Sequence, residues 1–488
     1  MASEDDALVE HPTFIDHIKF FFDDDDAACM KEERGIDLKS YESVKSNASN
    51  IYFQVKSGHM PPQEERRWSE NRVKTFRNWI IDKHPRGIEP FDAGRFEVAF
   101  ARADAPVRPN AASLSGDEVK RLAEAFSTLM AREPDDPNSY FALAGIHWFP
   151  APTYCIHNQP QYNPWHRLYI DRFEAGLRTV PGCEDICLPY WDITEEPPAW
   201  LFSPPFDSYV LQADASDAYP AGTATKHNSS DFIAQEVANF RISEQIRSAL
   251  NAPYFESFAV LIENAHNDGH GACGPSMSAT DIASFDPLFW FFHCNWERMW
   301  WAWQIRFKAG TLEGFRTALA TPSDADWLDH EAFNELPPFG ARTPATIAID
   351  GYNYETAPIS MFADNAENPA GSLAMGRRFS LDRSPRVSLR IKGIERLRIP
   401  GSFRATIMAD GKPVAERFFF QSTQPEACPN CANQPTVNLD FRLDPSLLAG
   451  KTIDVALRLV TPNGTDEEID PMKVGNPTVN IRELLQGE

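Results

Sequence analysis

The sequence predicts a mainly α-helical protein, in which an antiparallel helical bundle is followed by a small antiparallel β domain of sandwich type. Long stretches before about residue 320 place apolar side chains at helical spacing. After about residue 380 the period changes to two, and Val387, Leu389 and Ile391 alternate with polar residues. Asp410-Gly411 and Asn463-Gly464 are hairpin-turn signals in the same region. A small antiparallel domain of this kind is expected to form a sandwich.

Composition and period divide the chain of 488 residues into four segments. Residues 1–100 are expected to form a helical extension packed on the bundle, and residues 101–320 the bundle itself. Residues 321–380 are richer in Pro, Ala, Asp and Asn without a clear period, so we expect a wrapping linker there. Residues 381–488 form the expected β domain. A chain of this length can bury a functional site in its core.

Four helices of the bundle are expected to face inward, an arrangement that suits a site built from facing side chains. They span residues 140–146, Pro164–Leu177 with Pro164 in the first helical position, about 253–270 with Gly271 as the stop, and a last helix with Asp286 as N-cap. The last of them is apolar almost all round, so it should lie at the centre of the bundle.

Net charge and targeting signals limit the partners of the chain. With 46 basic and 70 acidic residues the net charge is −24, which argues against nucleic acid and anionic membranes as partners. No stretch approaches the roughly 20 apolar residues that cross a bilayer. The N-terminus shows no secretory signal, and eight Cys do not make a disulfide scaffold in a chain this long. We therefore expect a cytoplasmic protein, with a homo-oligomer left open.

Six of the 12 histidines form two clusters within the most apolar helical stretches. The first cluster is His147, His157 and His166, and the second is His266, His270 and His293. His266 and His270 are four residues apart, so they lie on one helix face and can share an ion. His293, on the next apolar helix, can complete a trigonal set. Two clusters of three predict two metal sites.

The donor set narrows the choice of metal without settling it. Neutral imidazole suits Cu, Zn, Fe or Ni, and the lack of carboxylates at comparable spacing argues against Mg, Ca and Mn. A zinc hydrolase would usually carry a Glu general base in a pattern such as H-E-x-x-H. Here Asn267 follows His266, although Glu263 precedes the pair and could orient a water. Spacing alone leaves the hydrolase as an alternative.

Two longer motifs carry more information than spacing. WHRLYIDRFE, with His166, and FDPLFWFFHCNWERMW, with His293, closely resemble the two copper signatures of the type-3 copper family of tyrosinases, catechol oxidases and haemocyanins. The segment from His266 to His270 is similar to the start of the second copper site. The resemblance covers about residues 140–310, and the β domain resembles the C-terminal domain of longer members. It implies two copper ions, one on each histidine cluster, with dioxygen and a phenolic molecule as substrates.

The resemblance also gives roles to neighbours of the ligands. Cys155-Ile-His157 matches a Cys-x-His in which many members join the Cys sulfur to the imidazole by a thioether bond. Asn267 matches an Asn that in active tyrosinases helps to hold a water able to deprotonate phenols, with Glu263 as its candidate partner. The residues expected near the substrate pocket are Phe289, Thr280 and Gly271.

The β domain resembles a lid found in some fungal tyrosinases, where a Phe enters the substrate pocket and a nearby Cys-x-x-Cys assists copper uptake. Arg417-Phe-Phe-Phe420 is followed here by Cys428-Pro-Asn-Cys431. We expect Phe419 to be the placeholder, and Cys428 and Cys431 to help load copper. The alternatives are strand residues of the domain core for the aromatics, and a loop disulfide or a small zinc site for the cysteines.

The resemblance implies a tyrosinase, a polyphenol oxidase that hydroxylates monophenols to o-diphenols and oxidises o-diphenols to o-quinones with dioxygen. Asn267 favours this activity over that of a catechol oxidase. A catechol oxidase, an o-aminophenol oxidase and a haemocyanin-like oxygen-binding protein remain alternatives. The natural phenol, and whether its product leads to melanin or to another metabolite, are not encoded in these motifs.

Overall fold

The computed structural model contains two compact units, residues 1–91 and residues 92–488. It describes residues 7–63, 66–87, 105–148, 155–321, 325–329, 333, 336, 346–349, 351–362, 386–461 and 465–484. None of the helices in these ranges combines the length and the hydropathy that a membrane span requires.

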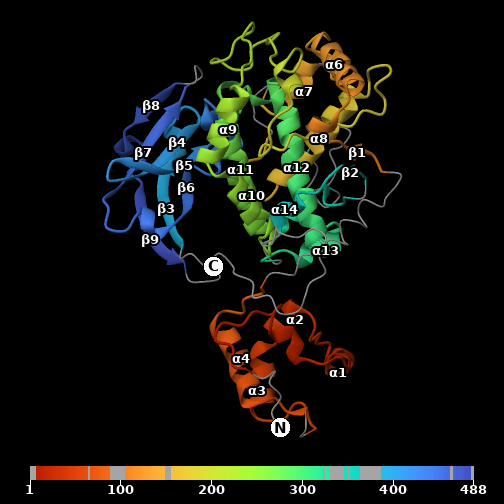
Figure 1. The fold of residues 1–488 in the computed structure, drawn as a ribbon, viewed down its shortest axis with the longest axis vertical. Helices are drawn as coiled ribbons and strands as arrows, with labels where there is room; N and C mark the ends of the chain where they lie inside the picture. The colour runs from red at the N-terminus through yellow and green to blue at the C-terminus, as the bar shows by residue number, and fades with distance from the viewer. Residues whose placement is uncertain are drawn as a thin grey trace. The chain divides into compact units, whose positions relative to one another are not determined.

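The first unit is helical (Figure 1), and aromatic side chains pack in its core. Its α-helices are α1 (Asp24–Arg34), α2 (Tyr41–Ser46), α3 (Ala48–Lys56) and α4 (Glu70–Ile81). The acidic run at residues 23–26 caps α1, because the Asp23 carboxylate accepts a hydrogen bond from the amide of Asp26 at 2.8 Å. Phe76 and Trp79 are fully buried on α4. The predicted packing of residues 1–100 on the bundle stays a prediction.

The helical bundle makes up most of the second unit. Its α-helices are α6 (Gly116–Met130), α7 (Tyr140–Gly145), α8 (Tyr162–Leu177), α9 (Ser230–Asn239), α10 (Ile242–Leu250), α11 (Phe255–Cys273), α12 (Leu288–Arg306), α13 (Leu312–Thr317) and α14 (Ile359–Phe362). A short parallel pair, β1 (Val107–Arg108) and β2 (Asn353–Tyr354), lies beside it. Every residue of α12 is buried, which confirms its predicted central place. Figure 1 shows α11 between α12 and the β strands.

Two helix starts differ slightly from the sequence prediction. Helix α8 begins at Tyr162, so Pro164 is its third residue and not its first. The whole first turn tolerates proline because its backbone amides have no partner within the helix. At α12 the N-cap position falls on Pro287, one residue after the predicted Asp286. The Asp286 carboxylate still accepts a hydrogen bond from the amide of Leu288 at 3.1 Å, so it caps the helix from one position earlier.

The predicted stop of α11 at Gly271 is wrong. The helix continues to Cys273 and ends at Gly274, whose φ of 59° lies in the left-handed region that favours glycine. Gly271 has a packing role instead. A Cβ atom at this position would lie 2.6 Å from the ring of Phe418, so only glycine lets the β domain approach α11 this closely.

The β domain, described here for residues 386–461 and 465–484, is the predicted antiparallel sandwich. Its strands are β3 (Arg386–Glu395), β4 (Phe403–Ala409), β5 (Lys412–Phe419), β6 (Thr436–Leu443), β7 (Ile453–Val460), β8 (Asp466–Ile469) and β9 (Thr478–Leu484). They form two sheets, in the orders β6-β3-β9 and β5-β4-β7-β8. Leu389 and Ile391 of one sheet pack with Phe403 of the other in a shared core. A short helix, α15 (Pro429–Ala432), follows β5.

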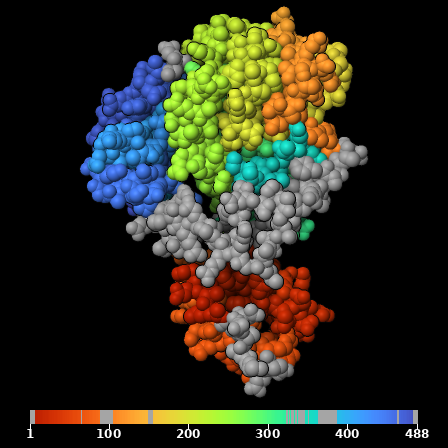
Figure 2. All heavy atoms as spheres, viewed as in Figure 1, coloured from red at the N-terminus to blue at the C-terminus, as the bar shows by residue number. Residues whose placement is uncertain are grey.

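The hairpin signal Asp410-Gly411 is confirmed, because the two residues join β4 to β5 with φ angles of 50° and 73°. The second signal, Asn463-Gly464, lies outside the described residues, as does most of the predicted linker at 321–380. In Figure 2 the β domain, in blue, lies directly against the yellow-green helices of the bundle. The Arg404 guanidinium and the Glu236 carboxylate form an ion pair of 2.9 Å across this contact.

A buried charge network ties α12 to α8 and β1. The Glu297 carboxylate of α12 accepts hydrogen bonds from Arg167 at 2.7 Å and from Arg108 at 3.1 Å, and also from the hydroxyls of Tyr352 and Tyr354. Burial alone would raise the pKa of Glu297, but the two guanidiniums hold it below its ordinary value. The carboxylate is therefore ionised and pairs with both arginines.

Replacing Glu297 by Ala is expected to lower the free energy of unfolding by about 3–5 kcal/mol. The substitution leaves the buried Arg167 guanidinium without a counter-charge, whereas Arg108 keeps the carboxylates of Asp171 and Glu174. Urea unfolding of the purified chain measures this change. Glu244→Ala is the matched control, since Glu244 pairs with Arg241 on the surface and should change stability by less than about 0.5 kcal/mol. Equal effects of the two substitutions would contradict a structural role for the network.

Candidate metal centre

The bundle brings all six predicted ligands together. His147 follows the end of α7, His157 lies on the loop before α8, and His166 lies on α8. His266 and His270 share one face of α11, and His293 comes from α12. Five of the side chains are buried and His157 is partly buried. Because separate helices and a loop supply the imidazoles, the site forms only in the folded chain.

The second cluster converges on a single point. The Nε2 atoms of His266 and His270 are 2.9 Å apart, and those atoms lie 3.3 and 3.2 Å from the Nε2 of His293. His270 Nδ1 donates to the Met277 carbonyl at 2.6 Å, and His266 Nδ1 to the Asn267 side-chain oxygen at 3.0 Å. Since those oxygens only accept, the Nδ1 atoms carry the hydrogens and the Nε2 atoms face one another with lone pairs.

Electrostatics makes this cluster a cation site. Burial, reinforced by the neighbouring imidazoles, holds the pKa of His266, His270 and His293 well below its ordinary value. The three rings are therefore neutral near pH 7, and their converging lone pairs repel one another. A metal ion placed between them would convert this repulsion into coordination, which requires the deprotonated ring that burial already favours.

The first cluster is more open. The ring centroids of His147, His157 and His166 are separated by 5.2 to 6.0 Å. His147 Nδ1 donates to the Thr280 carbonyl at 3.1 Å, and His166 Nδ1 donates to the Tyr162 carbonyl at 2.8 Å. The Nε2 atoms of all three are buried without a hydrogen-bond partner. Buried polar atoms are rarely left unpaired, so these three nitrogens point to a bound ion.

The two clusters face each other. The rings of His166 and His293 stack at 4.9 Å with an angle of 11°, and those of His157 and His266 stack at 5.7 Å with an angle of 20°. Six neutral imidazoles around one shared space fit a pair of copper ions, because copper stands highest in affinity among the divalent metals for nitrogen donors.

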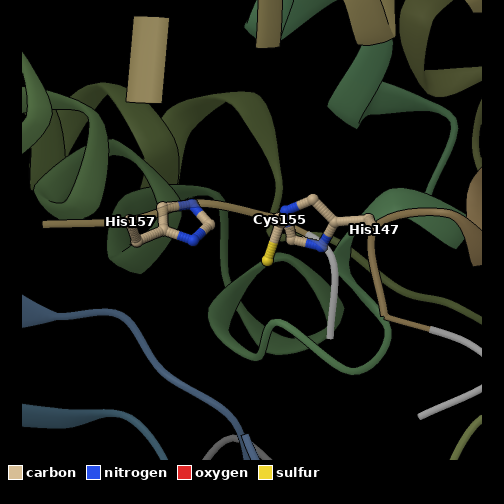
Figure 3. A group of neighbouring side chains, drawn as sticks. All are labelled: His147, Cys155 and His157. Atoms are coloured by element: carbon tan, nitrogen blue, oxygen red, sulfur yellow. The ribbon is translucent and has the colours of Figure 1, made fainter. Parts of the chain in front are cut away.

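A thiol joins the first cluster. The Cys155 sulfur and the ring nitrogens of His147 and His157 all lie within 4.8 Å of one another, and Figure 3 shows the three side chains together. Burial raises the pKa of the Cys155 thiol, so it is protonated near pH 7. In the folded chain Cys155 thus lies close to His157, as the predicted thioether bond requires.

The predicted pocket residues have different places. Phe289 stacks on His293 with ring centroids 3.9 Å apart, so it packs directly on the site. Thr280 holds His147 through its carbonyl and lines a small cavity with Cys155 and His157. Gly271 lies under the β domain, because the Phe418 ring packs against it. Its expected place near the substrate pocket stays a prediction.

Asn267 and Glu263 are both buried near the ligands. Asn267 orients His266 through the hydrogen bond to Nδ1, a contact that fixes a ligand ring directly. The Glu263 carboxylate accepts a hydrogen bond from the amide of Asn158 at 2.5 Å. Burial raises the pKa of Glu263 to about 8, against the opposing effect of that hydrogen bond. Glu263 is therefore a protonated acid near pH 7.

The aromatic side chain over the site is Phe420 and not the predicted Phe419. The Phe420 ring lies parallel to the His270 ring, with centroids 4.0 Å apart and an angle of 8°. Phe419 stacks on Phe403 at 5.0 Å inside the sandwich core. Successive strand residues point to opposite faces, so the residue next to a core position faces the bundle. The alternation of strand residues is a signal that could have shown that Phe418 and Phe420, and not Phe419, face the bundle.

The two remaining candidate residues, Cys428 and Cys431, lie at α15 beside the first cluster. Both side chains are buried, and the Cys431 thiol donates to the Cys428 sulfur at 2.6 Å. The Arg396 guanidinium donates to the Cys431 sulfur at 3.1 Å. Cys155, His157 and both cysteines line the same small cavity. This proximity links the cysteine pair to the first histidine cluster.

Known proteins share this architecture. A sequence-family profile described as the common central domain of tyrosinase matches residues 137–256 and 209–306, the region that holds all six histidines. Hemocyanin 2 of Megathura crenulata is 29% identical over 310 residues, which are 58% of this chain and 8% of that protein. A tyrosinase of Podospora anserina is 23% identical over 280 residues, which are 38% of this chain and 49% of that protein. The chain thus spans a small part of the haemocyanin and about half of the tyrosinase.

Solved structures agree on the fold. A tyrosinase from Burkholderia thailandensis has a TM-score of 0.57 at 19% identity, covering 78% of this chain and all of that one. A functional unit of octopus hemocyanin has the same TM-score and identity, with 77% of this chain and 99% of that unit covered. The match over residues 137–306, with the similar tyrosinases and haemocyanins, supports the type-3 copper protein family, which contains both groups. This family uses a dinuclear copper site, and the two histidine clusters fit it.

Proposed function

We propose that the chain is a copper-dependent phenol oxidase, a tyrosinase that converts monophenols to o-diphenols and o-diphenols to o-quinones with dioxygen. The observation that carries the proposal is the Phe420 ring stacked on His270 at 4.0 Å. The centre thereby accommodates a flat aromatic ring against a ligand, where a phenol would fit once Phe420 leaves. Binding dioxygen alone requires no space of that size. The full chain would then be a latent enzyme covered by its β domain.

The chain's own residues suit a phenol substrate. Bound copper would supply the redox chemistry that activates dioxygen. Phe289 and Phe420 line the site with aromatic surface, which favours a ring-shaped molecule. A phenol must lose its proton before it can bind a metal, and a water near Asn267 is a plausible base. Glu263 can accept a proton from such a water only after it has lost its own, because burial raises its pKa to about 8.

Oxygen uptake tests this proposal directly. Copper-loaded chain is supplied in parallel with tyrosine, catechol and an o-aminophenol, before and after a treatment that displaces the β domain. A tyrosinase consumes oxygen with tyrosine and with catechol. Uptake with catechol alone would indicate a catechol oxidase, and preferred uptake with the third substrate an o-aminophenol oxidase. Reversible oxygen binding without consumption would support the haemocyanin-type alternative, which the 29% identity to hemocyanin 2 favours.

Asn267→Ala is expected to lower the rate on tyrosine at least about tenfold more than the rate on catechol, because the proposal assigns the proton acceptor to monophenol hydroxylation. Initial rates of oxygen uptake with each substrate measure the difference. The structure also offers a second explanation for any loss of activity, since Asn267 orients the ligand His266. Equal losses on both substrates would show that Asn267 acts only on that ligand.

A thioether bond between Cys155 and His157 is a second expected feature of the mature centre. The sulfur lies beside the ring, and a covalent tether would fix the orientation of a ligand on a loop. The bond replaces the thiol S–H and a ring C–H, and dioxygen is the oxidant that takes up the two hydrogens. Peptide mass spectrometry should find the peptide with both residues lighter by those two hydrogens. A Cys155 thiol that can be fully alkylated in active, copper-loaded protein would contradict the bond.

Copper loading is the role proposed for Cys428 and Cys431. Thiolate sulfur is a soft donor that suits Cu(I), and the two sulfurs are close enough to hold one ion. Their cavity also contains Cys155 and His157, so an ion released there would be next to the first cluster. The contact with the Cys428 sulfur and burial raise the pKa of Cys431, against the opposing effect of the Arg396 guanidinium, so the thiol must lose its proton as it binds such an ion.

A further inference from the structure

The β domain holds the loop that carries His157. The Asn430 side-chain amide donates to the Cys155 carbonyl at 2.8 Å, and the Gln434 side-chain amide donates to the Asn158 carbonyl at 2.9 Å. Asn430 lies on α15 and Gln434 just after it. The two accepting carbonyls stand on either side of His157. Residues 155–158, here named the ligand loop, are therefore fixed at both ends by one face of the β domain.

The ligand loop needs such partners. It precedes α8 and belongs to no helix or strand, so no ladder of backbone hydrogen bonds holds it. Asn158 has a φ of 59°, a left-handed conformation that costs free energy in residues other than glycine. On the bundle side, the Glu263 carboxylate accepts a hydrogen bond from the amide of Asn158 at 2.5 Å. The loop is thus held between the two domains.

The second cluster does not depend on the β domain in this way. Its histidines lie on α11 and α12, and the Nδ1 partners of two of them, Asn267 and Met277, belong to the bundle. The three Nε2 atoms already lie within 3.3 Å of one another. In the first cluster, by contrast, the β domain also contacts Thr280, whose amide donates to the Gln421 carbonyl at 3.4 Å and whose own carbonyl holds His147.

We propose that Asn430 and Gln434 are positioning residues that complete the first metal site. Docking of the β domain fixes the ligand loop and with it His157, whereas the second site is assembled within the bundle alone. Metal should therefore bind the second site more tightly, and the affinity of the first site should depend on both amides. This inference rests on the proposed dinuclear centre.

Cobalt(II) binding to the full-length apo-protein tests the inference. Cobalt bound by thiolates has a charge-transfer absorption that imidazole complexes lack, so binding at the cysteines is recognised separately. The variants are Asn430→Ala, Gln434→Ala and their combination, with Gln434→Glu as an isosteric variant that lacks the amide donor. Gln424→Ala is the matched control, because the Gln424 amide also crosses to the bundle, at 3.3 Å from Asp217, but away from the ligand loop.

Wild-type protein and the Gln424→Ala variant are expected to bind two equivalents of cobalt(II) at the histidines. Each single variant should keep one tight equivalent and bind the other about tenfold more weakly, and the double variant about 100-fold more weakly. Gln434→Glu should behave like Gln434→Ala. Unchanged affinity for both equivalents would overturn the inference, and so would parallel weakening of both, which indicates a general loss of stability. A wild type that holds no equivalent at its histidines would overturn the proposed function as well.

Discussion

His270→Ala is expected to lower kcat/KM for catechol by about 1,000-fold or more, because metal-ion catalysis supplies several kcal/mol of transition-state stabilisation. His270 is a member of the tightest cluster, with its Nε2 within 3.2 Å of both partner nitrogens. Its removal leaves only two imidazoles for that ion. Oxygen uptake and elemental analysis on the same sample should show lost activity together with metal falling towards one equivalent.

His227→Gln is the matched control for this loss. His227 is a partly buried histidine, and its Nδ1 lies 3.0 Å from the Asp286 carboxylate, outside the two clusters. Metal content and activity of this variant should stay near those of wild type. A His270→Ala protein that retains two equivalents and oxidises catechol at the wild-type rate would contradict the ligand assignment.

Phe420→Ala is expected to raise kcat/KM for catechol in the full chain. Phe420 must leave the site before a phenol can enter, and burial of a Phe side chain stabilises the closed state by about 1.5–3 kcal/mol. Removing that stabilisation corresponds to an increase of roughly 10- to 150-fold. Steady-state oxygen uptake without any activating treatment measures it.

Phe419→Leu separates this effect from a general loosening of the β domain. Phe419 stacks on Phe403 in the sandwich core, so the substitution should reduce the stability of the domain without opening the site. Activation by Phe419→Leu but not by Phe420→Ala would reverse the assignment. A stable Phe420→Ala protein with unchanged kcat/KM would show that the ring does not block the substrate.

Local patterns predicted the parts of the protein that depend on neighbours in the chain. The spacing of His266 and His270 places both on one face of α11. The apolar surface of α12 predicts that this helix lies at the centre of the bundle. The alternation of Leu389 and Ile391 likewise predicts the sandwich. These features follow from the periods of helix and strand, which each segment carries in its own sequence.

The remaining features depend on contacts between distant segments. Gly271 resembles a helix stop in the sequence, but in the structure it leaves room for the Phe418 ring that packs against it. Phe420 and the ligand-loop contacts of Asn430 involve residues more than 100 positions away in the chain. Such contacts are set by how the β domain docks on α11, which no local period encodes.

Copper content of the wild-type chain is the most direct test of the dinuclear centre. The full-length protein is loaded with copper, weakly bound metal is removed, and copper per chain is determined by elemental analysis. The two histidine clusters predict two tightly bound copper ions per chain. A value of one or none, or retention of zinc in place of copper, would contradict the account.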